Sequence, residues 1–313
     1  MPNTQDIRWF KHTFGAEIAA ALSGTAFDSN QIVAIACQET GYIWSTLRKA
    51  GLTAAQITAL CVGDTIDFKP PDKGRSAFPR NKAALLAEPQ GQQMFDIARA
   101  ALVGMAQFID DYRGAAANPV KFCHGFGIFQ RDLQFFKDDP EYFLQRRYEV
   151  FADTLQHCLA ELRRGVRKLD LEAEAHLGDA DFCKVAIAYN TGRYKPSKGL
   201  RQGYFDGVKY YGEYIADYLA LSRTVSTDLA GQLGQSGQYR VIARSGLKLR
   251  SGPGTDFDWD RILPLGTTLQ VVHRAGADPA WALVDLQADG IVDGYVFASF
   301  LEPGATEAPP APD

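Results

Sequence analysis

The stretch IVAIACQETGYIW, residues 32–44, places one glutamate among apolar residues at helical spacing. The expected apolar stripe of this helix holds Ile32, Ile35, Ala36 and Glu39, with Gln31 and Gln38 on the other side. Burial disfavours the charged form of a carboxyl group and so raises its pKa. A carboxyl group that keeps its proton near neutral pH can protonate a poor leaving group such as a glycosidic oxygen. Glu39 is therefore the first candidate for a catalytic acid, and the alternative is a core glutamate that pairs with an arginine or lysine or turns to solvent at the helix end.

Two further stretches join apolar residues to a polar residue and a glycine at an expected helix end or start. They are HGFGIFQRD at residues 124–132 and VAIAYNTGRY at residues 185–194. Each is a weak signal alone. Their order after ACQETGY, residues 36–42, makes the set more specific.

The three stretches together resemble the lysozyme-like superfamily, in particular the soluble lytic transglycosylases and goose-type lysozymes. The matching residues are Glu39-Thr40 for Glu-Ser/Thr, Gly127-Ile128-Phe129-Gln130 for Gly-Leu-Met-Gln, and Ala188-Tyr189-Asn190-Thr191-Gly192 for Ala-Tyr-Asn-x-Gly. The resemblance implies that Glu39 is the catalytic acid and that Tyr189 hydrogen-bonds or orients it. It also implies a sugar cleft lined by Gly127, Ile128, Phe129, Gln130 and Asn190.

A second carboxylate is left open by the sequence. A glycoside hydrolase needs a base or a nucleophile beside the acid, whereas in lytic transglycosylases the sugar's own 6-hydroxyl attacks. Asp132 is the best-placed candidate, and Asp64 and Asp67 are others. The last two lie in residues 61–81, which are too rich in Pro, Gly and charge to predict regular structure. This segment lengthens the interval between the first two motifs and is a candidate lid over the substrate.

The charge balance excludes several classes of partner. The net charge is −4, and residues 1–238 carry as many basic as acidic side chains. Nucleic acids and anionic membranes require a basic surface that this balance does not provide. No stretch is long and apolar enough to predict a membrane-spanning helix, and the first residues lack the features of a cleavable signal peptide.

The five cysteines predict free, buried thiols, because they show neither paired nor metal-ligand spacing. We therefore expect no metal and no cofactor. A thiol peptidase is the rival chemistry, since Cys183 stands near an expected helix start and Cys123 precedes His124. Adjacent residues do not easily form a nucleophile–base pair, which argues against this rival.

The motifs require a mainly helical domain over residues 1–222 to position them. Helices are expected at residues 28–40, 90–114, 140–165, 179–192 and 206–223. Residues 223–238 read as a flexible linker and residues 304–313 as a disordered tail. Between them, residues 239–303 alternate polar and apolar side chains with frequent turn signals, which predicts a small all-β barrel.

The barrel segment closely resembles bacterial SH3-like domains over residues 240–303. The matching features are LKLRSGPG at 247–254, LPLGT at 263–267, a tryptophan strand, GYV at 294–296 and Leu301. The resemblance implies binding to the cell wall or to peptides, with a stabilising spacer as the alternative. Four residues could serve either structure or ligand contact, namely Arg250, Trp259, Trp281 and Tyr295.

The expected architecture is a mainly α lysozyme-like domain followed by a small all-β SH3-like barrel. The expected function is cleavage of peptidoglycan glycan strands by a muramidase or lytic transglycosylase, with wall peptide as a further partner of the barrel. The alternatives are a non-catalytic wall-binding protein and a chitin- or chitosan-cleaving glycosidase. Without a signal peptide, we expect action on the wall or periplasm after phage lysis or dedicated secretion, where an immunity or inhibitor protein could meet it.

Overall fold

The computed structural model describes residues 1–66, 75–225, 237–274 and 281–304. The chain folds as two compact units, of which the first comprises Met1–Pro2 with Phe14–Arg223. The second comprises Asn3–Thr13 with Thr224–Asp313. Helix α1, Thr4–Leu22, therefore contributes residues to both units.

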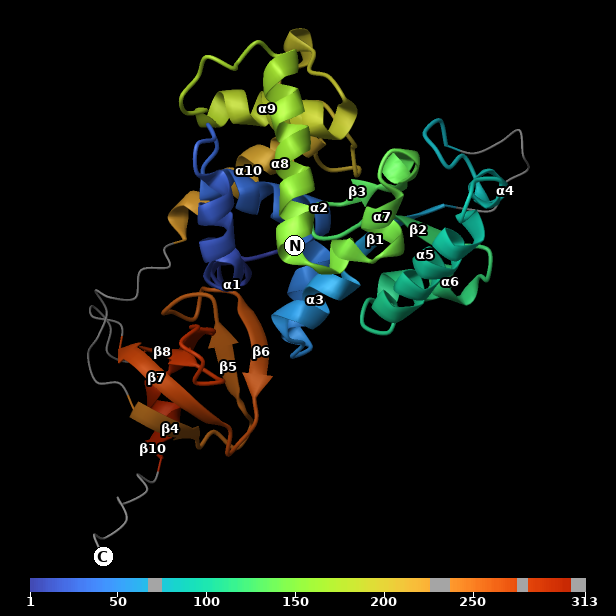
Figure 1. Cartoon of the computed structure of the whole chain (residues 1–313). Coiled ribbons are helices and arrows are strands. Elements are labelled where there is room, and N and C mark those ends of the chain that lie inside the picture. Colours follow the sequence, from blue (N-terminus) through green and yellow to red (C-terminus); the bar gives the residue numbers. More distant parts are fainter. Residues whose placement is uncertain (67–74, 226–236, 275–280, 305–313) are drawn as a thin grey trace, which may run out of the picture. The chain divides into compact units, whose positions relative to one another are not determined.

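The first unit is mainly helical, which confirms the predicted fold class of this region. Its further elements, with η for a 3-10 helix, are α2 (Ser29–Lys49), α3 (Ala54–Leu60), β1 (Val62–Ile66), α4 (Lys82–Leu86), α5 (Gly91–Met105), η1 (Asp110–Tyr112), α6 (Arg113–Ala117), β2 (Phe122–Phe126), β3 (Arg131–Asp132), η2 (Leu133–Lys137), α7 (Pro140–Leu144), η3 (Arg147–Glu149), α8 (Phe151–Lys168), α9 (Asp179–Thr191), η4 (Pro196–Lys198) and α10 (Tyr211–Thr224). In Figure 1, the strands β1–β3 and helices α4–α6 lie on one side of α8, and α10 lies on the other.

Helix α2 is the buried centre of this unit. It begins with a capping box in which the Asp28 side chain accepts from the Gln31 backbone and the Gln31 side chain accepts from the Asp28 backbone. The prediction that Gln31 lies on a polar side of this helix is wrong. Gln31 is fully buried, and its Nε2 donates to the Leu177 carbonyl at 2.7 Å. Residues 31–37 are all buried, so the first half of α2 is enclosed on every side.

A three-stranded antiparallel sheet, β1-β2-β3, stands beside the helices. Gly63 of β1 pairs with Gly125 of β2, and Gly125 also pairs with Asp132 of β3. The expectation that residues 61–81 lack regular structure is therefore wrong for 62–66, which form β1. Residues 67–74 lie outside the described part of the chain.

Three predicted helices are shorter than expected. Helix α10 begins at Tyr211 rather than at Asp206. In the other two, buried side chains turn the chain. Helix α5 stops at Met105 rather than near Gly114, and the turn that follows buries Ile109. The helix expected over 140–165 is broken at Arg146, whose φ of 56° is left-handed. The break lets Tyr148 pack against Phe126 with ring centroids 4.9 Å apart.

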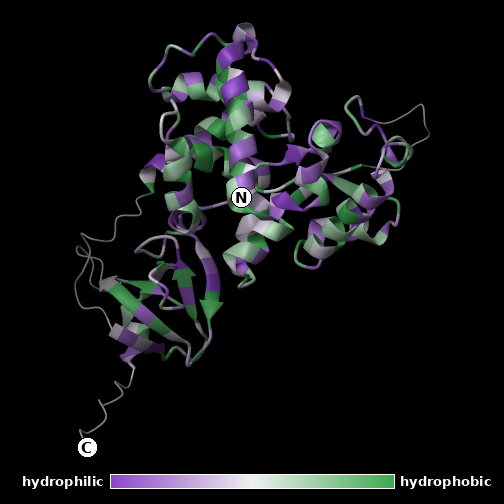
Figure 2. Ribbon diagram, in the orientation of Figure 1, coloured by the Kyte–Doolittle hydropathy of each residue, from purple (hydrophilic) through white to green (hydrophobic). Residues whose placement is uncertain are grey.

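The second unit is an antiparallel sheet with strand order β10-β4-β7-β8-β9-β5-β6, which confirms the predicted all-β class of the C-terminal region. The elements are β4 (Gly237–Val241), β5 (Leu247–Arg250), β6 (Trp259–Leu263), β7 (Thr268–Arg274), β8 (Trp281–Asp285), β9 (Gly294–Phe297), η5 (Ala298–Phe300) and β10 (Leu301–Pro303). Hydrophilic and hydrophobic colours alternate along these strands (Figure 2), as a half-buried sheet requires. The buried residues of its core include Val241, Leu249, Val271, Val284 and Val296.

The N-terminal residues Asn3–Thr13 group with this sheet rather than with the helices. Gln5 donates through Nε2 to the Arg250 carbonyl at 2.9 Å, and also to the carbonyl of Asp293. Among the described residues, no helix is long and apolar enough to cross a bilayer.

Candidate active site

Glu39 lies at a kink in α2. The next residue, Thr40, has φ −137° and ψ 16°, so the helix is interrupted directly after the glutamate and continues to Lys49. The Thr40 hydroxyl donates to the carbonyl of Ile128 at 2.6 Å. This bond ties the kink to the turn between β2 and β3, and so links the first and second motifs in space.

The Glu39 carboxyl is held by a tyrosine from α10. The Tyr211 hydroxyl donates to Glu39 Oε1 at 2.7 Å. Burial raises the pKa of Glu39 from 4.5 to about 8, with the Tyr211 hydrogen bond opposing the rise and the charge of Asp64 adding to it. Glu39 keeps a partly exposed surface, so the neutral acid is desolvated and still reachable.

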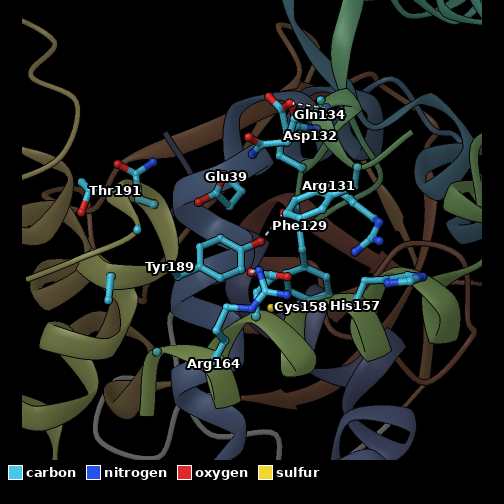
Figure 3. A pocket seen from close by; sticks show the side chains of 18 of the residues that line it. Glu39, Phe129, Arg131, Asp132, Gln134, His157, Cys158, Arg164, Tyr189 and Thr191 are labelled. Atoms are coloured by element: carbon cyan, nitrogen blue, oxygen red, sulfur yellow. Dashed lines mark hydrogen bonds and ion pairs between the residues drawn. The ribbon is translucent and has the colours of Figure 1, made fainter. Parts of the chain in front are cut away.

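A pocket of about 630 Å³ opens beside Glu39. Its lining brings together most residues of the three motifs, and Figure 3 shows Glu39 and the Tyr189 ring facing the same space. The predicted site residues that line it are Glu39, Phe129, Gln130, Asp132, Tyr189 and Asn190. Gly127 and Ile128, expected to line the cleft, are not part of its wall.

Gly127 and Ile128 instead shape the turn that carries Gln130. Gly127 has φ 79°, and a Cβ there would lie 2.5 Å from Thr154 Oγ1, so only glycine fits. Ile128 is fully buried. Gln130 has φ 51°, and its Nε2 donates back to the Gly127 carbonyl at 2.9 Å. The Gln130 side chain lies over Gly63 and Gly125, where an added Cβ would meet Oε1 at 2.6 Å and 2.2 Å.

The predicted hydrogen bond from Tyr189 to Glu39 is not formed, because the Tyr189 hydroxyl donates to the carbonyl of Phe129 (Figure 3). Burial raises the pKa of Tyr189 well above its ordinary value, with the nearby Cys158 and Glu39 adding to the rise, so its hydroxyl stays protonated. Tyr189 therefore joins the third motif to the second across the pocket, and Tyr211 supplies the contact to the acid.

Asp132 lies in the same pocket but both of its carboxylate oxygens are engaged. Oδ2 accepts from Arg75 Nη1 and lies near His124 Nδ1, each at 2.9 Å. Oδ1 accepts from Arg75 Nη2 at 2.5 Å and from the Gln134 backbone at 2.7 Å. Against the raising effect of burial, the His124 and Arg75 hydrogen bonds hold the pKa of Asp132 below its ordinary value.

Asp64 is the more accessible of the candidate second carboxylates. It is exposed, lines the pocket together with Glu39, and has a left-handed φ of 45° in β1. A non-glycine residue in this conformation is uncommon, and Asp is one of the residue types that adopt it more readily. The other candidate, Asp67, lies outside the described residues.

All five cysteines are free and buried, as the sequence predicts. Burial raises the pKa of Cys183 to about 11, with a smaller contribution from Asp179. Burial also raises the pKa of Cys123. Thiols in this state do not ionise near neutral pH, so neither cysteine fits the nucleophile of the rival peptidase.

Sequence reasoning missed Tyr211 and Arg75. The sequence contains 13 tyrosines, and Tyr211 belongs to no motif and is 172 residues from Glu39. Arg75 comes from the segment expected to be irregular. Its side chain also donates to the carbonyls of Ala77 and Phe78, which fixes the turn beside the pocket. Only the fold brings these side chains to the site.

The structure of the second unit distinguishes the four residues that could serve either structure or ligand contact. Trp281 is buried and packs edge-on against Phe297 at 5.3 Å, and Arg250 donates to the carbonyls of Thr255 and Phe257. Both of these side chains therefore maintain structure. Trp259 is 49 % exposed on the edge strand β6, with Lys248 Nζ 4.9 Å from its ring. Tyr295 is half-buried.

Residues 245–302 match the bacterial SH3 domain family. The match confirms the resemblance of the C-terminal unit and suggests a cell-wall-binding role for it. No curated protein and no solved structure matches the chain. The lysozyme-like character of the helical unit stays a prediction.

Proposed function

We propose that the protein cleaves the glycan strands of peptidoglycan, with Glu39 as general acid. The observation that carries the proposal is the placement of Glu39, which lies at a helix kink with a pKa raised by burial to about 8, beside a pocket of about 630 Å³. Such a carboxyl group is protonated at neutral pH and can donate its proton to a glycosidic oxygen. The convergence of all three motifs on this pocket supports the same chemistry.

The second carboxylate in this proposal is Asp64 rather than Asp132. Arg75, His124 and the Gln134 backbone already occupy both oxygens of Asp132. Asp64 is exposed in the pocket, and its charge raises the pKa of Glu39. In a hydrolase, Asp64 would activate the attacking water. In a transglycosylase, the substrate's 6-hydroxyl would attack, and Asp64 would be dispensable.

The bacterial SH3 domain supports the cell wall as the place of the proposed activity. We infer that this domain holds the helical unit against the cell wall, where the glycan strands lie. A non-catalytic wall-binding protein is the second candidate, favoured by the same domain match.

The test is incubation of purified sacculi with the wild type, Glu39→Gln and Asp64→Asn, followed by mass spectrometry of the released fragments. Loss of the general acid should lower the cleavage rate by about 10²- to 10⁴-fold. Reducing ends that disappear in Asp64→Asn identify a hydrolase. Anhydro ends that persist in Asp64→Asn identify a transglycosylase. Chito-oligosaccharides digested in parallel test the chitin alternative.

The Glu39→Gln variant needs a folding control, and thermal unfolding against pH supplies one. The pKa of Glu39 is raised by folding, so the contribution of this residue to wild-type stability is fully present below pH about 4.5 and is lost as the pH rises towards 8. Glutamine has no such dependence and still accepts from Tyr211, so the variant should be at least as stable at pH 7. Undiminished cleavage by a folded Glu39→Gln protein would sink the proposal. Binding without cleavage by the wild type would support the second candidate.

A further inference from the structure

The chain between α9 and α10, residues 192–210, forms a long loop that is braced from within (yellow in Figure 1). Gln202 is 7 % exposed, and its side chain supplies the brace. It accepts from the Lys195 backbone at 2.8 Å and donates to the carbonyls of Lys195 and Gly199 at 2.9 Å and 2.6 Å. These bonds fix the base of the α9–α10 loop, so its other side chains are presented in defined positions.

The end of this loop is a hairpin over residues 204–210, and its charged groups turn back toward α10. The Asp206 carboxylate accepts from two backbone groups of the turn and from the Tyr214 hydroxyl at 2.7 Å. The Lys209 ammonium pairs with Asp217 at 2.5 Å. Both charges of the hairpin are therefore partnered on the side of α10.

The exposed side chains of the α9–α10 loop include four large apolar ones. They are Val208 at 76 %, Tyr204 at 74 %, Phe205 at 47 % and Leu200 at 37 %. Surfaces commonly carry single apolar side chains, but here four fall within nine residues of one braced loop whose buried position is taken by a glutamine. This arrangement indicates a surface that meets an apolar partner.

A pocket of about 360 Å³ adjoins the loop between α9 and α10, and Leu200 lines it. The other lining residues are mostly small or apolar and include Ala180, Cys183, Tyr194, Ala216, Leu219 and Ala220. The charged residues of the wall are Asp179, which pairs with Arg223, and Lys184, which pairs with Asp181. Because both charges are already paired, the pocket suits a hydrocarbon group better than a sugar, whose hydroxyls need polar partners.

The α9–α10 loop is also basic, although the chain has a net charge of −4. Residues 192–210 contain five Lys or Arg and a single acid, Asp206. Four of the bases are exposed, namely Arg193, Lys195, Lys198 and Arg201. The even charge balance of residues 1–238 argues against an anionic membrane only as an average, and this loop departs from it.

We propose that the α9–α10 loop and its pocket dock on an anionic lipid bilayer, with the hairpin among the headgroups and the pocket holding a lipid chain. Leu200 belongs both to the exposed apolar group and to the pocket wall, which joins the two into one surface. Apolar side chains flanked by lysine and arginine bind at the membrane interface, where the cations meet lipid phosphates. A glycan strand offers no hydrocarbon group to the pocket. This lipid contact is independent of the proposed cleavage.

The experiment measures flotation of the full chain with vesicles of phosphatidylcholine alone and with vesicles that also contain phosphatidylglycerol. Binding to the anionic vesicles should be at least about tenfold tighter, since each basic side chain near an anionic surface contributes about fivefold. High salt should reduce this difference by screening the charges. Equal binding to the two kinds of vesicle, or binding to neither, would overturn the inference.

The double variant Tyr204→Ser/Val208→Ser should bind anionic vesicles about tenfold more weakly, because it removes apolar groups from the hairpin. The matched control is Tyr42→Ser/Val103→Ser, which removes the same residue types at 44 % and 40 % exposure from α2 and α5. The control should bind vesicles as the wild type does. An equal loss in the two double variants would show that the hairpin is not the contact.

The pocket is tested by Ala216→Leu/Ala220→Leu, which fills it from α10. This variant should bind anionic vesicles more weakly than the wild type, and thermal unfolding checks that it is folded. Unchanged vesicle binding by the folded variant would overturn the assignment of the pocket to a lipid chain.

Soluble glycan strands test the other class of partner for the same surface. Loss of glycan binding in Tyr204→Ser/Val208→Ser, with vesicle binding unchanged, would make the loop a glycan contact and overturn the inference. The vesicle assays contain no wall material, so failure of the proposed cleavage would leave their expected results as they are.

Discussion

A carboxyl group that donates a proton near neutral pH has to be kept from ionising, and its surroundings decide whether this happens. Glu39 follows seven buried residues of α2 and meets the pocket at the kink, so most of its surroundings are protein rather than water. The hydrogen bond from Tyr211 and the charge of Asp64 then act in opposite directions on its pKa. Burial dominates, which makes this position suited to an acid.

The Tyr211 contact predicts a change in the pH profile. In the wild type, kcat/KM should fall as the pH rises through about 8, because Glu39 loses its proton. The hydrogen bond from Tyr211 lowers the pKa of Glu39, so Tyr211→Phe should move this fall to higher pH. The variant should also lose about fivefold in kcat, since an orienting hydrogen bond contributes about 1 kcal/mol. The measurement is kcat/KM on soluble glycan strands from pH 5 to about 10.

Tyr189→Phe is the matched control for this prediction. Its hydroxyl donates to the Phe129 carbonyl and makes no hydrogen bond to Glu39, so its removal should leave the alkaline fall in place. A Tyr211→Phe profile identical to that of the wild type, or a shift of equal size in Tyr189→Phe, would contradict the assignment of Tyr211 as the positioning residue.

At the scale of elements, the loop between α9 and α10 fixes Tyr211 against the site. Gly203, in this loop, has φ 85°, and a Cβ there would lie 2.5 Å from Tyr211 Cβ and 2.9 Å from Asn190 Oδ1. The loop backbone thus fills the space between α10 and the end of α9. Glycine is required both by the conformation and by the close approach.

Gly203→Ala should therefore displace Tyr211 and impair activity together with stability. The positive φ alone costs about 1–3 kcal/mol, and the contact with Tyr211 adds to this. Gly207→Ala is the control, because Gly207 has φ 101° in the same loop and nothing within 4 Å of an added Cβ. Thermal unfolding and kcat should both fall further in Gly203→Ala. Equal effects in the two variants would show that backbone strain alone is responsible.

At the scale of the whole molecule, the two units divide the proposed work, with glycan chemistry in the helical unit and wall attachment in the bacterial SH3 domain. Trp259 and Ile262 lie on the edge strand β6, and Phe257 precedes that strand; all three side chains are nearly half exposed. Large exposed aromatic side chains are frequent anchors at binding surfaces. We propose Trp259 as the wall contact of the domain.

Trp259→Ala should weaken co-sedimentation with sacculi while leaving kcat on soluble glycan strands unchanged. The expected loss in sacculus affinity is about tenfold, typical of an aromatic anchor worth more than 1 kcal/mol. Phe300→Ala is the control, since Phe300 is 46 % exposed but lies in η5, away from β6 in the strand order. Equal binding by both variants and the wild type would move the wall contact elsewhere on the domain.

Several features could be predicted from local sequence. The helical class of residues 1–222 and the strands after residue 239 follow from hydrophobic periodicity. This periodicity can be read from each segment without knowledge of the rest of the chain. Glu39 could be singled out because a charged residue interrupts an apolar run. The bacterial SH3 domain could be recognised in the sequence because its turns require particular residue types at fixed positions.

Other features depend on parts of the chain that are distant in sequence. The strand β1 depends on its pairing with β2, which runs from Val62 opposite Phe126 to Ile66 opposite Phe122, and the segment 62–66 carries no strong strand pattern of its own. The break at Arg146 allows Tyr148 to pack against Phe126. The apolar periodicity of residues 140–165 does not reveal this break. The sequence by itself thus determined the class of each region and the identity of the candidate acid. Only the tertiary structure decided that Tyr211 holds that acid, that Asp132 is engaged by Arg75 and that Asp64 is exposed in the pocket, because hydrogen bonds and desolvation depend on distances in space.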